Sequence, residues 1–273
     1  MSSRTPSGLS IRLLRPLLAW GPLRRRLALA LRLFHFGDLE FDLPLSHGLS
    51  CTLGLPEDSY SLSEIFINDS YSVLLSDGAS ALPSRWLDLG CHAGYFSLWL
   101  EWRRRSLGLP MDSSTAFLVD ADARRLPGVT RLLERNGVAP CWRFTHGAIS
   151  AGEGQRVFYQ RSVMASSAEH FASEPGHAVS VPILTPALLL KQFPPPYDLI
   201  KIDIEGGEVD FFAHYETFWL QARNILFEWH ADSLGSTGVD GLRSRLRDNG
   251  FSRMREFGTS ADGATGHILA SRA

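Results

Sequence analysis

The stretch Arg85-Trp-Leu-Asp-Leu-Gly-Cys-His-Ala-Gly-Tyr-Phe96 decides the fold of this 273-residue chain. A short apolar run ends at Leu89, glycines follow at positions 90 and 94, and a helical pattern begins at Tyr95. Glycines at such a turn let the backbone approach a ligand at the carboxyl end of a strand. A dinucleotide site needs the spacing G-x-G-x-x-G, whereas three residues separate Gly90 from Gly94. The stretch therefore predicts a nucleotide-sized pocket and disfavours NAD and FAD.

Apolar strand-like runs alternate with helical patterns on the carboxyl side of this turn. The predicted strands are residues 86–89, 116–119, 142–145, 199–204 and 225–229, followed by a hairpin of residues 251–254 and 267–270. Helices are expected at residues 95–105, before Asn136-Gly137, and around residues 188–190, where Pro194-Pro-Pro196 ends the helix. This alternation is typical of βαβ units and predicts a doubly wound α/β domain over residues 76–273.

Two further regions precede that domain. Residues 34–75 mix turn signals with short apolar or alternating runs, such as 39–43 and 65–67, and are expected to form a β-rich or mixed cap region. Residues 1–33 contain seven arginines and no acid, and we interpret them as a basic amphipathic arm. The arm is a helical lid or dimer contact, a helix on a membrane surface, or an organelle-type presequence. No run in it reaches the ~18–20 apolar residues of a membrane helix.

The overall composition is that of an ordinary globular protein. With 44% hydrophobic residues, 21% charged residues and a formal charge of −2, the chain shows no general adaptation for nucleic acid. Its three cysteines are widely spaced and form no C-x-x-C pair, so neither a disulfide framework nor a zinc site is expected. These features favour a cytoplasmic protein, with peripheral membrane or protein contact through the arm as an option.

Small or acidic residues follow three of the predicted strands. Asp88, near the end of the first of them, is expected to orient, directly or through water, a ligand that carries an ammonium group and no phosphate. At the end of the next strand, Asp120 is placed to accept both hydroxyls of a ribose, and Asp122 is expected to cap the following helix. After the third strand, an adenine ring could lie against the backbone at Ala148, although turn chemistry explains Gly147 equally well.

The second informative segment is Leu199-Ile-Lys-Ile-Asp-Ile-Glu-Gly-Gly-Glu208, where three charged residues alternate with apolar ones. On a strand, Lys201, Asp203 and Glu205 would face one side. Charges inside a buried strand are costly unless they are paired or functional, so Asp203 and Glu205 are expected to line a site. Lys201 either pairs internally with an acid or takes part in catalysis or substrate binding.

A last group of polar residues is Glu228-Trp-His230, at the end of another predicted strand. A histidine beside a carboxylate suits a general base near neutral pH, so His230 is the candidate base. An ordinary hydrogen-bonded histidine at a strand end explains the pattern equally well. A divalent metal held by Asp203, Glu205, Glu228 and His230 is a minor alternative, and no metal is predicted.

With these residues in hand, the chain resembles the FkbM family of methyltransferases. Its first motif is similar to Asp88-Leu-Gly-Cys-His-Ala-Gly-Tyr-Phe96, and its later signature to Lys201-Ile-Asp-Ile-Glu-Gly-Gly-Glu208. Supporting positions are Asp120, Asn136, Ala148 and the Glu228-Trp-His230 segment, so the resemblance covers residues 65–230. The chain departs from the family at Cys91-His92, where Ala-Asn is usual, and at Thr185-Pro186, where Leu-Asp is usual.

The resemblance implies a Rossmann-like class I methyltransferase with a seven-stranded sheet that uses S-adenosyl-L-methionine. The residues expected to hold the cofactor are Asp88, Gly90, His92, Gly94, Asp120, Ala148 and Asp203, and those expected to face the acceptor are Lys201, Asp203, Glu205 and His230. The implied reaction is O-methylation of a sugar or secondary metabolite, hence a small-molecule or glycan acceptor. N-methylation of a peptide amide or amine, and a non-catalytic binding or docking module, are the alternatives. The oligomeric state is left open.

Overall fold

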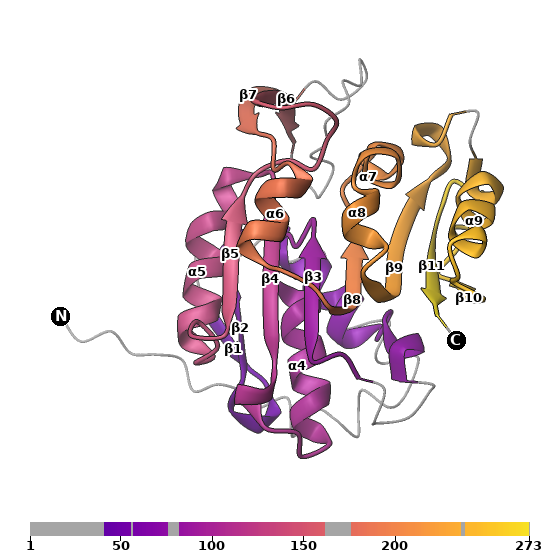
Figure 1. The fold of residues 1–273 in the computed structure, drawn as a ribbon. Coiled ribbons are helices and arrows are strands. Elements are labelled where there is room, and N and C mark those ends of the chain that lie inside the picture. Colours follow the sequence, from indigo (N-terminus) through magenta and orange to yellow (C-terminus); the bar gives the residue numbers. More distant parts are fainter. Residues whose placement is uncertain (1–40, 56, 76–81, 162–175, 236–237, 273) are drawn as a thin grey trace.

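The computed structural model describes residues 41–55, 57–75, 82–161, 176–235 and 238–272. Within these residues the main sheet has seven strands in the order β10-β11-β9-β8-β3-β4-β5. These strands are β3 (Arg85–Leu89), β4 (Thr115–Asp120), β5 (Trp142–His146), β8 (Tyr197–Ile202), β9 (Ala222–His230), β10 (Arg253–Phe257) and β11 (Thr265–Ser271). Strands β9, β8, β3, β4 and β5 run parallel, whereas β11 pairs antiparallel with β9 and β10 (Figure 1). The predicted mostly parallel, seven-stranded sheet with a C-terminal antiparallel hairpin is confirmed.

Helices cover both faces of this sheet, as a doubly wound fold requires. One apolar core lies under α4 (Tyr95–Ser106) and α5 (Leu126–Arg135). The other lies under α6 (Pro186–Gln192), α7 (Glu208–His214), α8 (Glu216–Trp219) and α9 (Gly238–Asp248). Alternate strand residues enter the two cores, so Trp86 faces α4 while Leu87 and Leu89 belong to the opposite core. Short helical turns η5 (Met111–Ser113), η6 (Ala123–Arg125) and η7 (Ala231–Ser233) complete the loops.

The described part of the N-terminal region is mixed, with two strands followed by helical turns. Its elements are β1 (Phe41–Pro44), η1 (Ser46–Gly48), β2 (Ser50–Leu53), α3 (Asp58–Leu62), η2 (Ser63–Ile67) and η3 (Ser72–Leu75). The apolar run at residues 65–67 is helical rather than extended, because Ile65 and Ile67 pack as part of a helix against the α4 core. Asn136, at the end of α5, bonds both the N–H and the carbonyl of Ser50 at 2.7 and 3.0 Å. The predicted arm, residues 1–33, lies outside the described residues.

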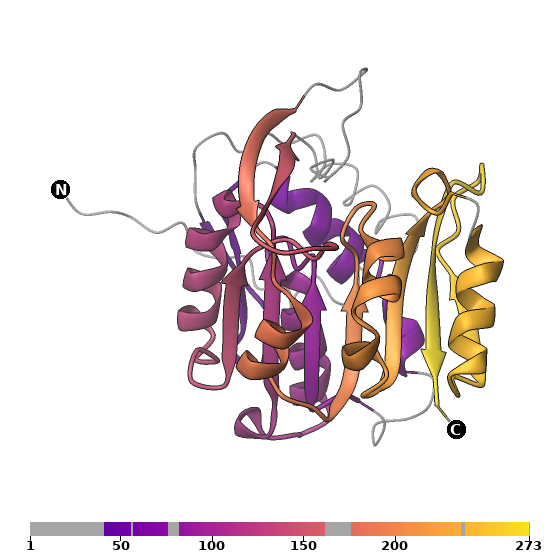
Figure 2. The ribbon, with the colours of Figure 1, turned by 45° about the horizontal axis from the view of Figure 1, so that its top comes forward.

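A separate two-stranded hairpin follows β5. Strands β6 (Gln155–Gln160) and β7 (His177–Pro182) pair antiparallel and rise above the carboxyl edge of the main sheet (Figures 1 and 2). The turns that follow β3, β4, β5 and β8 all lie at this edge, since these strands are parallel. No helix in the described ranges has the length and apolarity needed to cross a membrane.

Candidate functional site

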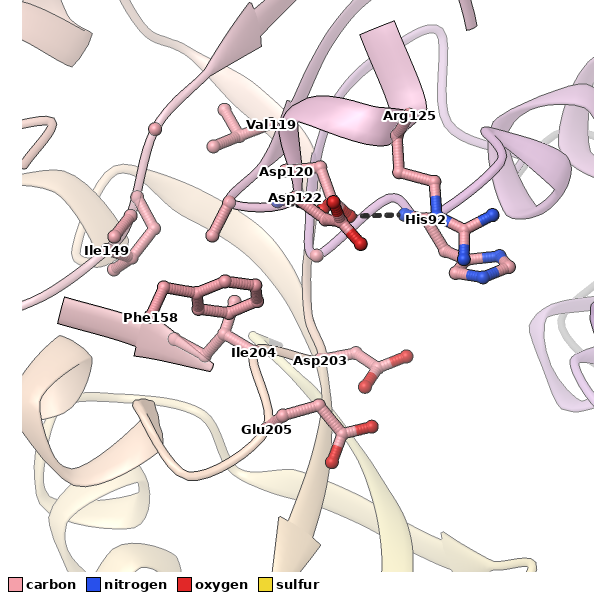
Figure 3. A pocket seen from close by; sticks show the side chains of 14 residues that line it. His92, Val119, Asp120, Asp122, Arg125, Ile149, Phe158, Asp203, Ile204 and Glu205 are labelled. Atoms are coloured by element: carbon pink, nitrogen blue, oxygen red, sulfur yellow. Dashed lines mark hydrogen bonds between the residues drawn. The ribbon is translucent and has the colours of Figure 1, made fainter. Parts of the chain in front are cut away.

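A cavity lies at the carboxyl edge of the sheet, where the turns after β3, β4, β5 and β8 meet (Figure 3). The lining comes from the end of β4, these turns, η6 and β6: Gly90, His92, Val119, Asp120, Ala121, Asp122, Arg125, Gly147, Ala148, Ile149, Phe158, Asp203, Ile204 and Glu205. In Figure 3, Ile149 and Phe158 lie on one side, and the carboxylates of Asp203 and Glu205 on the other. The cavity therefore has an apolar end and a polar end.

The floor of the cavity is the turn at Gly90, which only glycine can form. Gly90 has a φ of +73°, and a Cβ placed on it would lie 1.5 Å from the carbonyl oxygen of Asp203. The N–H groups of Gly90 and Cys91 both donate to the Val119 carbonyl at 2.9 Å. The turn is thus pressed against the ends of β4 and β8, and its backbone faces the cavity.

Asp120 ends β4 and carries a carboxylate fixed by backbone donors. Its two oxygens accept from the N–H groups of His92 at 2.7 Å and Asp122 at 2.8 Å. Burial raises the pKa of Asp120 to about 6, against the opposing effect of these hydrogen bonds. Asp122 accepts from the N–H of Arg124 at 3.0 Å, which confirms its predicted role as a helix cap. Each Asp120 oxygen retains a free lone pair for a ligand hydroxyl.

Two residues predicted to hold a cofactor lie beside the cavity and not in its lining. Asp88 is fully buried because it shares a strand face with Trp86 and so points toward α4. There it accepts a 2.7 Å hydrogen bond from Ser97 Oγ. Gly94 is the N-cap residue of α4 and has a φ of +76°. A Cβ built on it would lie 3.3 Å from the side chain of Leu118. In this geometry Asp88 does not line the cavity and Gly94 shapes the turn. The orientation of a ligand ammonium by Asp88, directly or through water, stays a prediction.

Lys201 interacts both with the buried Asp88 and with the cavity residue Asp203. Its ammonium donates to Asp203 Oδ2 at 2.9 Å and to the Gly90 carbonyl at 3.2 Å, and lies 3.5 Å from Asp88 Oδ1. Burial opposes the charge of Lys201, but Asp203 and Asp88 outweigh it and raise the pKa of the ammonium. Burial would likewise raise the pKa of Asp203, yet Lys201 lowers it to about 2. Of the two interpretations of Lys201, the structure shows the internal pairing, which keeps Asp203 ionised at the cavity wall.

Glu205 reaches the cavity from a turn rather than from a strand. Strand β8 ends at Ile202, and Glu205 has a φ of +50°, so the predicted regular alternation stops before it. His230, the last residue of β9, lies behind Glu205 with 3.5 Å between its Nε2 and Glu205 Oε2. Its other ring nitrogen is 3.9 Å from Glu208 Oε1. His230 is thus brought beside the site, although it is not in the cavity lining.

Glu228, in β9, interacts with the acidic side chains of Asp203 and Glu205. A side-chain hydrogen bond joins it to Asp203, and burial together with the Asp203 charge raises the pKa of Glu228. Of these two acids, Glu228 therefore holds a proton more readily than Asp203. His267 Nε2 lies 3.7 Å from Glu228 Oε2, and burial lowers the pKa of His267 to about 4, so this ring is neutral.

His92, one of the positions that departs from the FkbM pattern, has two functions in the turn. Its φ of +49° turns its backbone N–H toward Asp120, and its ring Nδ1 lies 3.0 Å from Ser61 Oγ. Burial and the nearby Arg125 lower the pKa of His92, so the imidazole is neutral. The neighbouring Cys91 is buried and does not line the cavity.

The lining residues that were not predicted as site residues include Arg125 and Phe158. Arg125 is almost fully buried, and its guanidinium donates to Asp58 at 2.8 Å and to Glu57 at 2.9 Å. Phe158 comes from the β6–β7 hairpin. Neither carried a sequence signal, because an arginine in a first helical turn and a phenylalanine in an alternating strand are both ordinary. Among the described residues, no cluster of three or more histidine, cysteine, aspartate or glutamate side chains is placed to hold a metal ion.

Known proteins of similar fold include several methyltransferases. An O-methyltransferase family protein from Burkholderia thailandensis aligns with 9% identity and a TM-score of 0.46, over 80% of this chain and 60% of that one. Precorrin-6y C5,15-methyltransferase from Geobacter metallireducens GS-15 aligns with 12% identity and a TM-score of 0.38, over 71% of this chain and 85% of that one. A human methyltransferase 10 domain containing protein aligns with 14% identity and a TM-score of 0.41, over 76% of this chain and 81% of that one.

The sequence itself matches a family description but no individual curated protein. The matched family is the Methyltransferase FkbM domain, over residues 138–253. This range contains the Ala148 turn, the Lys201–Glu208 signature and the Glu228-Trp-His230 segment, and thus the residues that carry the polar end of the cavity. The resemblance to the FkbM methyltransferases is thereby confirmed over residues 138–253.

Proposed function

We propose that this protein is an S-adenosylmethionine-dependent methyltransferase that methylates a hydroxyl group of a sugar or a secondary metabolite. The observation that carries the proposal is the pair of acids on either side of the Gly90 turn. Asp120 at the end of β4 and the ionised Asp203 after β8 both line the cavity. An adenosyl amino acid needs an acceptor for two ribose hydroxyls and an anion for its ammonium group.

The residues of the cavity fit this cofactor. Asp120 has free lone pairs for the ribose, and Asp203 is kept ionised by Lys201 for the ammonium. A Cβ at Gly90 would collide with the backbone of Asp203, so only glycine fits there. The peptide groups of this glycine turn line the cavity, where they can contact the ligand. When bound, S-adenosylmethionine supplies an electrophilic methyl group.

On the acceptor side, the chain must orient a hydroxyl and take up its proton. Glu205 is the carboxyl group that reaches the cavity there, and burial and the neighbouring acids Asp203 and Glu208 raise its pKa. A raised pKa makes the carboxylate a stronger proton acceptor, and His230 at 3.5 Å is placed to share that proton. We therefore assign proton uptake to the Glu205–His230 pair. A base of this kind contributes ~10²–10⁴-fold, and orientation of the reactants contributes ~7–11 kcal/mol.

N-methylation of an amine is the second candidate function. On the acceptor side, Asp203 and Glu205 line the cavity, Glu208 and Glu228 lie close to them, and the ammonium of Lys201 pairs with Asp203. Such an excess of acids suits a cationic amine as well as a polyhydroxylated acceptor.

Both candidates are tested by incubating cell extracts with the full chain and methyl-labelled S-adenosylmethionine, followed by mass spectrometry of small molecules and glycans. We expect label on an oxygen of the product, and label on a nitrogen would favour the second candidate. The Glu205→Gln variant is the control, because it keeps the cofactor residues and removes the proton acceptor. A folded protein that binds neither adenosylmethionine nor adenosylhomocysteine would refute the proposal.

Asp120 is expected to matter more for cofactor binding than His230. The variant Asp120→Ala should weaken adenosylhomocysteine binding by about 10-fold to 100-fold, since charge-assisted hydrogen bonds contribute roughly 1.5–3 kcal/mol. His230→Ala should change the affinity less than about threefold, because His230 lies outside the cavity lining. Titration calorimetry measures both, with thermal unfolding as the check on folding. The opposite order of effects would contradict the assignment.

The affinity for adenosine should depend on pH through Asp120. The pKa of this carboxyl is raised to about 6, so the carboxylate that accepts the ribose hydroxyls is lost as the pH falls through 6. We expect constant affinity above about pH 7 and a loss of about tenfold per pH unit below pH 6. Asp203, with a pKa of about 2, stays ionised over this range. The control is Asp120→Asn, which should bind more weakly and with a flat pH profile in calorimetry.

A further inference from the structure

The β6–β7 hairpin is a built part of the cavity wall. It contacts the turn after β5, where Ala148 N–H donates to the Pro182 carbonyl at 2.8 Å. At the opposite end of the hairpin, Gln160 Nε2 donates to Asp122 Oδ1 at 2.8 Å, and Arg124 donates to the Arg161 carbonyl at 3.0 Å. The hairpin is therefore tied at both ends, to the loops after β5 and after β4.

These ties hold one side chain of β6 against the cavity. Phe158 is only 7% exposed and packs with Ala148 and Val181. The preceding Val157 is 50% exposed, as expected for the opposite face of a strand. Since Phe158 is also a lining residue, its ring forms part of the apolar end of the cavity (Figure 3).

The position of this ring relative to the acids gives it a role. In Figure 3, Asp120 lies above the cavity, with Ile149 and Phe158 toward one side of it and Asp203 and Glu205 toward the other. A ligand whose ribose bonds Asp120 and whose ammonium bonds Asp203 must direct its base toward Phe158. We propose that Phe158, presented by the β6–β7 hairpin, is the positioning residue that packs against the adenine ring. This inference rests on the proposed function.

The inference is tested by calorimetry on the full chain with two probes, adenosine and adenosylhomocysteine. Contact between a base and an aromatic ring is worth roughly 1–3 kcal/mol when the ring is truncated to alanine, so Phe158→Ala should lose about 5-fold to 150-fold in affinity. Both probes carry the base, and they should therefore lose the same factor. Val157→Ala, on the exposed face of the same strand, should bind both probes as the wild type does.

A second pair of variants separates this role from a general defect. Phe158→Leu keeps an apolar side chain for the hairpin core but removes the ring, and it should still weaken both probes. Asp203→Asn should weaken adenosylhomocysteine and spare adenosine, which has no ammonium. If folded Phe158→Ala and Phe158→Leu bind adenosine as the wild type does, the inference is overturned. Failure of the wild type to bind either probe would instead remove the proposed function.

Discussion

Replacing Gly90 with alanine is expected to abolish binding of adenosylhomocysteine and to lower the free energy of unfolding by more than about 4 kcal/mol. The left-handed φ of +73° alone disfavours alanine by roughly 1–2 kcal/mol. The larger effect comes from the added Cβ, which would lie 1.5 Å from the Asp203 carbonyl oxygen. Backbone, and not a flexible side chain, occupies that space, so β3 and β8 would have to separate at their carboxyl ends.

Denaturant unfolding and calorimetry measure the two effects of Gly90→Ala. Gly108 supplies a matched control, because its φ is +77° and no atom lies within 4 Å of a Cβ built there. Gly108→Ala should therefore show the conformational cost alone, about 1–2 kcal/mol, with normal ligand binding. Equal destabilisation by the two substitutions would show that the contact with Asp203 is unimportant.

Lys201→Met should destabilise the protein by about 3–5 kcal/mol at pH 7, because it leaves buried carboxylates without their partner. The ammonium lies 2.9 Å from Asp203 and 3.5 Å from the fully buried Asp88. Binding of adenosylhomocysteine should weaken as well, since the low pKa of Asp203 depends on Lys201.

The sign of the pH dependence distinguishes this mechanism from a packing defect. In the wild type the lowered pKa of Asp203 contributes stability at pH values above its unfolded pKa, and this contribution is lost as the pH falls toward 2. In Lys201→Met the unpaired buried acids take up protons more readily, so the difference between variant and wild type should shrink as the pH falls from 7 to 4. Lys191→Met, at the other and exposed lysine, should change stability by less than about 0.5 kcal/mol at any pH. A pH-independent difference for Lys201→Met would point to packing.

Much of the fold could be predicted from the sequence because its signals are local. Helix α4 begins at Tyr95 as predicted, since a glycine turn and a long apolar pattern mark its start. The end of β4 at Asp120 and the end of β8 just before Asp203 could be placed for the same reason. The secondary structure of residues 65–67 could not be predicted, because three apolar residues fit a strand and a helix equally and tertiary packing decides between them.

The site was predicted less completely because it depends on contacts between distant segments. Which strand face Asp88 occupies follows from its neighbours α4 and Lys201, and not from the motif that contains it. Phe158 reaches the cavity only because a hairpin folds back over the turns after β4 and β5. Arg125 is held there by two acids nearly 70 residues away in the chain.

The ion pairs of Arg125 also bear on where this protein can be divided. Glu57 and Asp58 belong to the N-terminal segment, while Arg125 forms part of the cavity wall. Apolar residues of the same segment, such as Cys51 and Leu62, are continuous with the core beneath α4. A truncated chain that starts after residue 75 would therefore expose that core and leave the buried guanidinium of Arg125 without its acidic partners. We therefore expect the described residues before position 76 to unfold together with the sheet domain, and the boundary at residue 75 stays a prediction.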